Sequence, residues 1–371
     1  MESLMKTKNK LSRLNYLDVA KGLAIILVLI GHYPKTDSGI VTWLSSFHMP
    51  LFFLITGMLI KYTKEPERKM AELMRKKARM ILLPYVTFSA IVIMLRSAYG
   101  FYKTAEFSQT DLMEDVMQTV TFSGISVLWF LPVLFFAQLL FIYVIKFWGR
   151  NITYITAVVF LFVSMAGNRL YQGYFGETKL SFEKALSELI LVLLRILLAY
   201  VLITAGYVFQ TYFQQKKIFS FTELFITFLL FLFGIAIAVS NTRVDMRTMV
   251  LGNEGFFLIG ALVSSAAVIL LCRNFDVFYY PLKNVFSSIG KNSLVIMATH
   301  VDFFVMLAAL KGSEFVKTKN PVIQIIMETI CVIIIIGALE MVIIYLYNHY
   351  LYFLLGRNKP RKKFKVISSN K

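Results

Sequence analysis

The sequence predicts an all-α polytopic membrane protein with about ten transmembrane helices and both termini in the cytoplasm. Its 371 residues are 58% hydrophobic and only 16% charged, and the mean hydropathy is +0.68. This composition is unlike that of a soluble domain. Apolar runs of about 20 residues, the length of a helix that crosses a bilayer, recur along the whole chain. These observations indicate a helical protein embedded in a membrane.

Ten apolar runs qualify as spans, and the connections between them are too short for a separate domain. We therefore expect a single membrane-embedded domain over residues 1–371, with basic cytoplasmic tails at 1–16 and 357–371. The expected spans are 17–33, 40–61, 80–100, 126–146, 151–167, 188–213, 221–240, 255–272, 293–310 and 321–347.

The charges in the connections predict the orientation. With the N-terminus inside, the inner segments hold about two thirds of the 39 basic residues but only about a quarter of the 21 acidic residues. This asymmetry, together with contacts to anionic lipid, accounts for the formal net charge of +18. We therefore expect the lipid bilayer as a partner and no nucleic acid.

The first span carries a polar stripe. It reads DVAKGLAIILVLIGH from Asp18 to His32, with Lys21 between them. At about 3.6 residues per turn, Lys21 and His32 lie on one face of a helix, about 16 Å apart along its axis. Asp18 lies about one turn before Lys21, near the same stripe. Because ionisable groups within a span are costly and usually face a cavity or a protein interior, we predict that this stripe lines a functional cavity.

The second span begins from the outer side and places His48 at a depth similar to that of His32. Two histidines at one depth, with the Lys21 cation below them, favour a functional site over isolated packing residues. Three glycines of the first two spans are expected to let helices approach closely: Gly22, Gly31 and Gly57.

The cytoplasmic loop 61–79 is rich in lysine and arginine, which its topology largely explains. A cluster of cations directly before the third span would also lie at the inner mouth of a cavity. There it would suit the phosphates of a nucleotide-type ligand. Both interpretations stay open for the four members of this cluster, Arg75, Lys76, Lys77 and Arg79.

Further candidates fall in the later spans. Arg195 lies about two turns inside the sixth span and is expected to pair with Glu328 or another buried acid, in a structural or a catalytic role. His300, in the ninth span, either lines the cavity or packs in the interior. Trp129 begins the fourth span, where interfacial tryptophans are common.

Several other residues are explained without a site. Arg96 and Glu223 lie near span ends and are better interpreted as interfacial side chains. Cys272 and Cys331 lie in apolar runs without a partner pattern, so we expect neither a disulfide nor a metal site. The sequence also lacks the GxxxxGK[ST] phosphate-binding motif and the GxSxG nucleophile motif.

Five segments in order resemble the acyltransferase 3 family of integral-membrane acyltransferases, in particular its small fucose-4-O-acetylase-like members. They are LDVAKGLAIILVLIGH, SFHMPLFFLITG, RKKARMILLPY, LWFLPVLFF and IGKNSLVIMATH, so the resemblance covers essentially the whole chain. The family pattern in the first helix is a basic residue, ten intervening residues and a histidine, and here it falls on Lys21 and His32. Lysine departs from the arginine usual in the wider family.

The resemblance implies transfer of an acyl group, usually acetyl, from cytoplasmic acyl-CoA to a hydroxyl group. The acceptor would be an extracytoplasmic or lipid-linked glycan or another cell-envelope component, as in polysaccharide modification. The enzyme would be an O-acetyltransferase of the bacterial cytoplasmic (inner) membrane, with acetyl-CoA as a co-substrate and no permanently bound cofactor.

The chemistry assigns roles within this expectation. A histidine with a pKa of about 6.5 is suited to deprotonate an acceptor hydroxyl, so we expect His32 to be the general base or, alternatively, a transient acyl carrier. His48 would orient the acceptor or stabilise charge on the thioester oxygen. Lys21 and Asp18 would shape the channel, and Lys21 would also contact the donor. The cluster from Arg75 to Arg79 would bind the CoA phosphates.

Two other functions explain polar residues inside the spans. A transporter of a small polar solute or an amino acid such as serine would need them too. A glycan-export component without chemistry would need a wide hydrophilic path but no His32. We rank the acyltransferase first, the transporter second and the export component third.

Overall fold

The computed structural model describes residues 15–34, 38–175, 181–212, 221–278, 280–317 and 321–358, and these are almost entirely helical. Within this part of the chain, nine helices or helical stretches are long and apolar enough to cross a membrane. The prediction of an all-α polytopic membrane protein is therefore confirmed. Most of the two basic tails lies outside the described residues.

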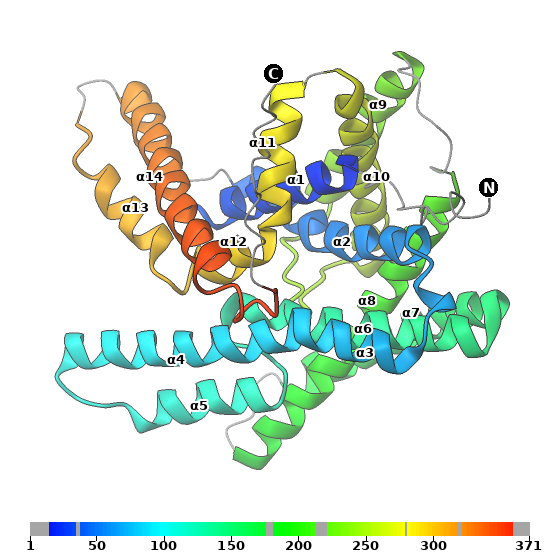
Figure 1. Ribbon diagram of the computed structural model, residues 1–371, viewed down its shortest axis with the longest axis horizontal. Coiled ribbons are helices and arrows are strands. Elements are labelled where there is room, and N and C mark those ends of the chain that lie inside the picture. Colours follow the sequence, from blue (N-terminus) through cyan, green and yellow to red (C-terminus); the bar gives the residue numbers. More distant parts are fainter. Residues whose placement is uncertain are drawn as a thin grey trace, which may run out of the picture.

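The N-terminal half places α1 and α2 in the centre of the molecule and lays α3, α4 and α5 along one edge (Figure 1). The elements are α1 (Asn15–His32), α2 (Ser38–Tyr62), η1 (Glu65–Glu67), α3 (Met70–Lys77), the π-helical η2 (Ala78–Leu82), α4 (Leu83–Thr104), α5 (Gln109–Val120), η3 (Ser126–Trp129) and α6 (Phe130–Phe147).

The C-terminal half packs around this centre, with α11 crossing α1 and with α13 and α14 standing together at one side (Figure 1). The elements are α7 (Gly149–Phe175), α8 (Ser181–Tyr212), α9 (Phe221–Val239), α10 (Glu254–Phe278), α11 (Tyr280–Lys291), α12 (Ser293–Thr299), α13 (Val305–Ser313) and α14 (Pro321–His349).

One predicted span is interrupted. The prediction of a continuous helix over 293–310 is wrong, because α12 ends at Thr299 and α13 begins at Val305. Phe304, just before α13, adopts a left-handed backbone conformation with φ of 59°. Non-helical backbone at membrane depth is tolerated where it is buried in protein or lines a cavity. The apolar composition of this run therefore concealed a break that carries His300.

Glycines set the closest helix contacts. A Cβ atom at Gly22 would collide with the backbone carbonyl of Phe286 in α11, and one at Gly57 would collide with the carbonyl of Ile203 in α8. The prediction of close approach is confirmed at both positions. It is wrong at Gly31, where a Cβ would meet no atom within 4 Å. Gly31 instead borders the cavity described below.

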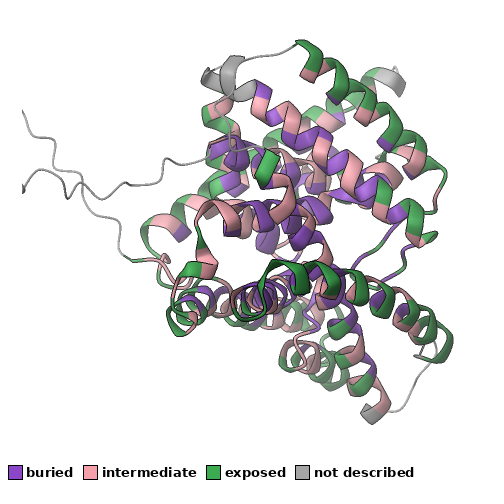
Figure 2. Cartoon of the chain, turned by 90° about the vertical axis from the view of Figure 1, so that its right-hand side faces the viewer, coloured by how far each residue is buried: buried purple, intermediate pink, exposed green. Residues whose placement is uncertain are grey.

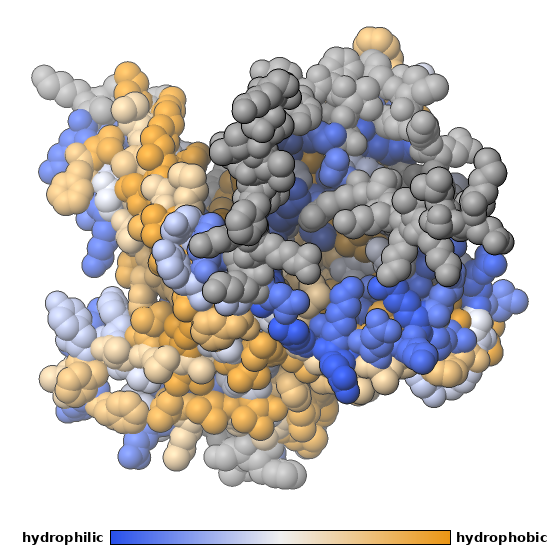
Figure 3. Space-filling view, in the orientation of Figure 1, coloured by the Kyte–Doolittle hydropathy of each residue, from blue (hydrophilic) through white to orange (hydrophobic). Residues whose placement is uncertain are grey.

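Burial and hydropathy separate an interior from a lipid-facing exterior. Buried residues concentrate in the middle of the bundle and exposed residues at its margins (Figure 2). Apolar side chains cover the face formed by α14 and much of α4, whereas hydrophilic side chains gather near α3 (Figure 3). The outward apolar residues of α14 include Ile326, Ile330, Ile333 and Ile334. An apolar surface of this kind suits contact with acyl chains.

Candidate active site

A cavity of about 460 Å³ lies where α1 ends, and it brings together residues far apart in the sequence. Three of its lining residues are histidines, namely His32 at the end of α1, His48 in α2 and His300 directly after α12. Trp129 of η3 also lines it. The predicted pairing of His32 and His48 at one depth therefore corresponds to a shared cavity. His300 lines that cavity while its side chain is also packed in the interior.

Backbone hydrogen bonds fix the tautomers of two of these histidines. The Nδ1 of His48 lies 2.5 Å from the carbonyl oxygen of Leu44, and the Nδ1 of His300 lies 2.9 Å from that of Ile296. A carbonyl oxygen can only accept, so each Nδ1 carries the proton. In the neutral ring the Nε2 atom then presents a lone pair. Neutral His48 and His300 therefore offer acceptors, not donors, at Nε2.

His32 and His300 are in ring contact. Their ring centroids are 5.2 Å apart, with an angle of 57° between the ring planes. His300 is completely buried, whereas His32 is exposed at the end of its helix. His32 thus faces the cavity with His300 behind it.

The connection between α9 and α10 forms a wall of the cavity that sequence reasoning missed. Residues 240–253 fold back on themselves, since the backbone amides of Asp245 and Val250 each donate to the other's carbonyl oxygen, at 2.8 and 3.0 Å. All five residues from Arg243 to Arg247 line the cavity, with Val244 and Met246 buried and three charged side chains alternating with them. The alternation of charged and apolar residues in RVDMR was a signal of this arrangement.

Arg195 ties two loops of this wall together. Its guanidinium donates to the carbonyl oxygen of Ser123 at 3.0 Å and to that of Arg247, and it lies over the Trp129 ring at 5.4 Å. The predicted pairing of Arg195 with Glu328 is therefore wrong, and Glu328 accepts from Gln324 one turn earlier in α14. Two carbonyl oxygens and an aromatic face contact the buried guanidinium, and the Glu188 carboxylate adds a favourable electrostatic interaction.

A tight turn brings Trp129 to this position. Gly124 has a φ of 78°, and a Cβ there would collide with the backbone of Trp129. Trp129 is only 5% exposed, so it is a wall residue of the cavity and not an interfacial anchor.

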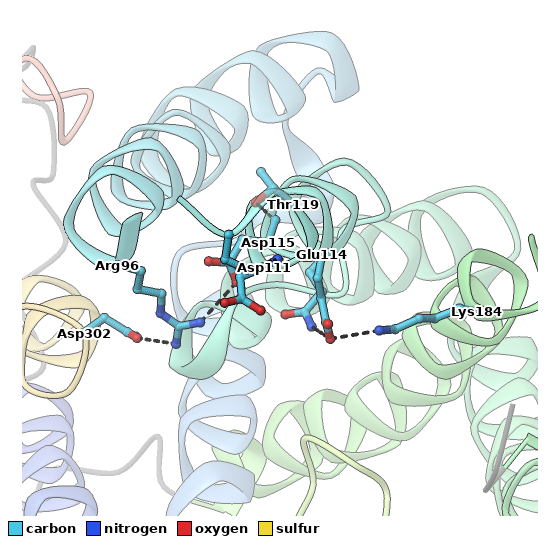
Figure 4. Close-up of polar contacts among 9 residues, drawn as sticks. Arg96, Asp111, Glu114, Asp115, Thr119, Lys184 and Asp302 are labelled. Carbon is cyan, nitrogen blue, oxygen red and sulfur yellow. Dashed lines mark hydrogen bonds and ion pairs between the residues drawn. The ribbon is translucent and has the colours of Figure 1, made fainter. Parts of the chain in front are cut away.

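Arg96 supports the break beside His300 (Figure 4). It donates to Asp115 of α5 at 3.1 Å and to Asp302, two residues after His300, at 2.7 Å. The Arg96 side chain is 40% exposed, and it forms two ion pairs that the sequence did not predict. Burial raises the pKa of Asp115, which the Arg96 guanidinium opposes. Arg96 thus holds α4, α5 and the break together.

A second cavity of about 360 Å³ borders this network. Arg96, Asp111 and Asp115 line it, and Arg247 lines both cavities. The two cavities therefore adjoin at the Arg247 side chain.

The other predicted site residues lie away from the cavity. Asp18 is buried and Lys21 is half-buried in α1, and neither is among the residues that line the histidine cavity. Both engage in contacts with other groups of the protein. Because α1 is one uninterrupted helix, Lys21 and His32 keep the predicted relative placement on it.

The four predicted phosphate-binding cations do not form one surface. Lys77 is buried, where it pairs with Glu65 at 2.7 Å and donates to Gln138 at 2.7 Å. Arg75 and Lys76 are exposed, and Arg79 donates to Asn358 at 3.0 Å. The prediction that Lys77 shares one phosphate surface with its neighbours does not fit this burial. Among the described residues, no group of three His, Cys, Asp or Glu side chains is arranged to hold a metal ion.

Comparison with known proteins places the chain in a family. Residues 14–349 match the Acyltransferase domain family, which covers essentially the whole sequence. No curated protein and no solved structure matches the chain. The match agrees with the resemblance noted in the sequence and favours acyl transfer over transport or export. The chain therefore belongs to the acyltransferase 3 family, and it is a multi-pass membrane acyltransferase.

Proposed function

We propose that the protein moves an acyl group, in the simplest case acetyl, from cytoplasmic acyl-CoA to a hydroxyl of an extracytoplasmic or lipid-linked glycan or another cell-envelope acceptor. The main support is the cavity where His32 and His48 meet beside the Arg243–Arg247 loop. The proposal places the N- and C-termini in the cytoplasm and the cavity toward the outer face of a bacterial cytoplasmic membrane. The charge distribution supports that orientation.

His32 acts as the general base in this proposal. Its imidazole takes the proton of the acceptor hydroxyl as the oxygen attacks the thioester carbon. The new C–O bond forms, the C–S bond breaks, and the proton on His32 passes to the departing CoA thiolate. The products are an ester and free CoA. The exposed position of His32 in the cavity suits this transfer, because both substrates must reach the same nitrogen.

His48 and the loop arginines serve different steps. Since the Nδ1–H of His48 is held by Leu44, its Nε2 in the neutral ring accepts and does not donate. It therefore orients the acceptor by accepting from a hydroxyl and does not stabilise negative charge on the thioester oxygen. Arg243 and Arg247 supply donors in the same cavity, and we assign that stabilisation to them.

The donor enters from the opposite side in this proposal. The exposed Arg75 and Lys76, with Arg79, provide cations for the phosphates of CoA. Lys77 is excluded from that role because Glu65 already neutralises it. The pantetheine arm follows α1 past Asp18 and Lys21, which shape the path and the local field, over the rise of about 16 Å that separates Lys21 from His32.

The test is transfer of label from radioactive acetyl-CoA to glycan or lipid-linked acceptors by the purified protein in liposomes. His32→Ala should lower the rate at least about 1000-fold, because it removes the base. His349→Ala is the control, since His349, like His32, is an exposed histidine at the end of its helix but lies outside the residues that line the cavity. Full activity of His32→Ala would refute the assignment.

A second candidate function is transport of a small polar solute such as serine, and the interrupted α12–α13 segment favours it. Transporters often bind their substrates at broken helices near the membrane midplane. Counterflow of labelled serine in the same liposomes, without any dependence on acyl-CoA, would support this alternative. Labelled acceptor without counterflow would eliminate it.

A further inference from the structure

His300 occupies an unusual position for a buried polar side chain. It follows α12 at the start of the break, where its carbonyl oxygen accepts from the amide of Met306 at 2.9 Å. Its side chain is completely buried, and its Nε2 atom has no hydrogen-bond partner among the described residues. Buried polar atoms are normally paired, so an unpaired one at a functional cavity calls for a partner.

The missing partner must be a donor. Nδ1 of His300 donates to the carbonyl oxygen of Ile296, so in the neutral ring Nε2 carries a lone pair. The polar ring packed against it is that of His32, with its centroid 5.2 Å away. A neutral His32 has one N–H and one lone pair, on opposite sides of its ring. It can therefore donate to His300 and still present a lone pair elsewhere.

Contacts on both sides hold His300 in place. Before it, the Thr299 hydroxyl bonds to the Glu340 carboxylate of α14, at 3.0 and 3.1 Å from its two oxygens. After it, Asp302 accepts from Arg96 at 2.7 Å. The break is thus anchored to both α14 and α4. Such anchoring makes the position of Nε2 independent of the substrates.

We propose that His300 is a positioning residue whose Nε2 accepts the N–H of His32, fixing the tautomer of His32 so that its other nitrogen faces the cavity as the base. The proposal rests on the proposed function, in which His32 is the base. The relay runs from the Ile296 carbonyl through the His300 ring to the His32 ring. In a catalytic triad a carboxylate orients the histidine that acts as the base. Here the neutral ring of His300 would take the place of that carboxylate. A rotation of the His32 ring closes the remaining gap, as catalytic hydrogen bonds often tighten only with substrate.

Two amide variants separate this role from simple packing. In His300→Gln, the side-chain carbonyl oxygen reaches the place of Nε2 and still accepts. In His300→Asn, the amide reaches only the place of Nδ1, so the contact with Ile296 is kept and the acceptor for His32 is lost. We expect kcat to fall about 10- to 100-fold in His300→Asn, with little change in KM, and to stay within about threefold of wild type in His300→Gln. Equal losses in the two variants would contradict the proposal.

A second measurement does not depend on acyl transfer. The chain has four histidines, so ¹⁵N-histidine labelling gives few ring signals, which His32→Ala and His349→Ala assign. We expect one His32 tautomer in the wild type and a mixture in His300→Asn. A ¹⁵N–¹⁵N coupling through the hydrogen bond should join the His32 and His300 rings in the native protein.

The NMR signals and the acyl-transfer assay separate a failure of the positioning role from a failure of the proposed function. Absence of both the coupling and a fixed His32 tautomer in the native protein overturns the positioning role, even if acyl transfer is found. A fixed tautomer with no acyl transfer leaves the relay standing and refutes the proposed function. Both outcomes are measured on the native protein, so the test holds even if His300→Asn does not fold.

Discussion

The histidine cavity and the cationic segment from Arg75 to Arg79 are organised in opposite ways. In the cavity, His32 and His48 of the first two helices meet His300, which follows α12 much later in the chain. In the cationic segment, neighbours in the sequence separate, with Lys77 paired inside the protein and Arg75 exposed outside. Successive residues of a helix point about 100° apart, so adjacency along the chain does not produce a shared surface. Convergence at a site depends on which helix ends the fold brings together.

After the loss expected for His32→Ala, the largest expected effect tests whether His48 acts in the shared cavity. His48→Phe removes the hydrogen-bond acceptor that orients the acceptor substrate and should lower acyl transfer about 100-fold. His349→Phe, which replaces an exposed histidine with the same type of backbone bond, should leave transfer within about twofold. The measurement is kcat with labelled acetyl-CoA in liposomes. Equal effects of the two substitutions would indicate that His48 does not act in the cavity.

The next prediction, of intermediate size, tests whether Lys77 has a different role from its neighbours in the cationic segment. Lys77→Met leaves Glu65 without its cation and should lower the free energy of unfolding by about 3 kcal/mol, with an unchanged KM for acyl-CoA. Lys76→Met should raise the KM for acyl-CoA about threefold, because one phosphate contact is lost, and should leave the stability unchanged. Thermal unfolding in detergent and steady-state kinetics measure both quantities.

The double variant Lys77→Met/Glu65→Gln provides the control for this contrast. It should recover part of the stability lost in Lys77→Met, since no uncompensated charge is left. A raised KM in Lys77→Met with unchanged stability would show that the four cations do act as one phosphate site.

The smallest expected effect concerns the network that supports the break. Burial raises the pKa of Asp115 above its ordinary value, so the folded protein binds this proton more tightly than the unfolded chain does. The charged carboxylate therefore costs stability above that raised pKa, and the cost is relieved as the pH falls toward the ordinary value. The change should stay below about 1 kcal/mol, because Arg96 opposes the shift. Comparing unfolding of the wild type and Asp115→Asn at pH 7 and pH 5 should show a smaller pH dependence in the variant.

Composition and periodicity alone predicted the helical membrane class, most of the spans and the polar stripe of α1. These properties follow from local physics, because a bilayer requires long apolar helices and one helix fixes the relative placement of Lys21 and His32. The motifs in the sequence also predicted the family. The sequence also predicted His32 and His48 as candidate site residues, because polar side chains are rare in apolar spans.

Only the tertiary structure decided the rest. The break after Thr299, the cavity wall made by Arg243 to Arg247 and the bond from Arg195 to two loop carbonyls all depend on partners far away in the chain. The partners of Arg96 and Arg195 were not predicted, because a sequence shows the cost of a buried cation but not which groups compensate it. The sequence by itself determined that the first helix carries a base candidate; packing determined that His300 lies behind it.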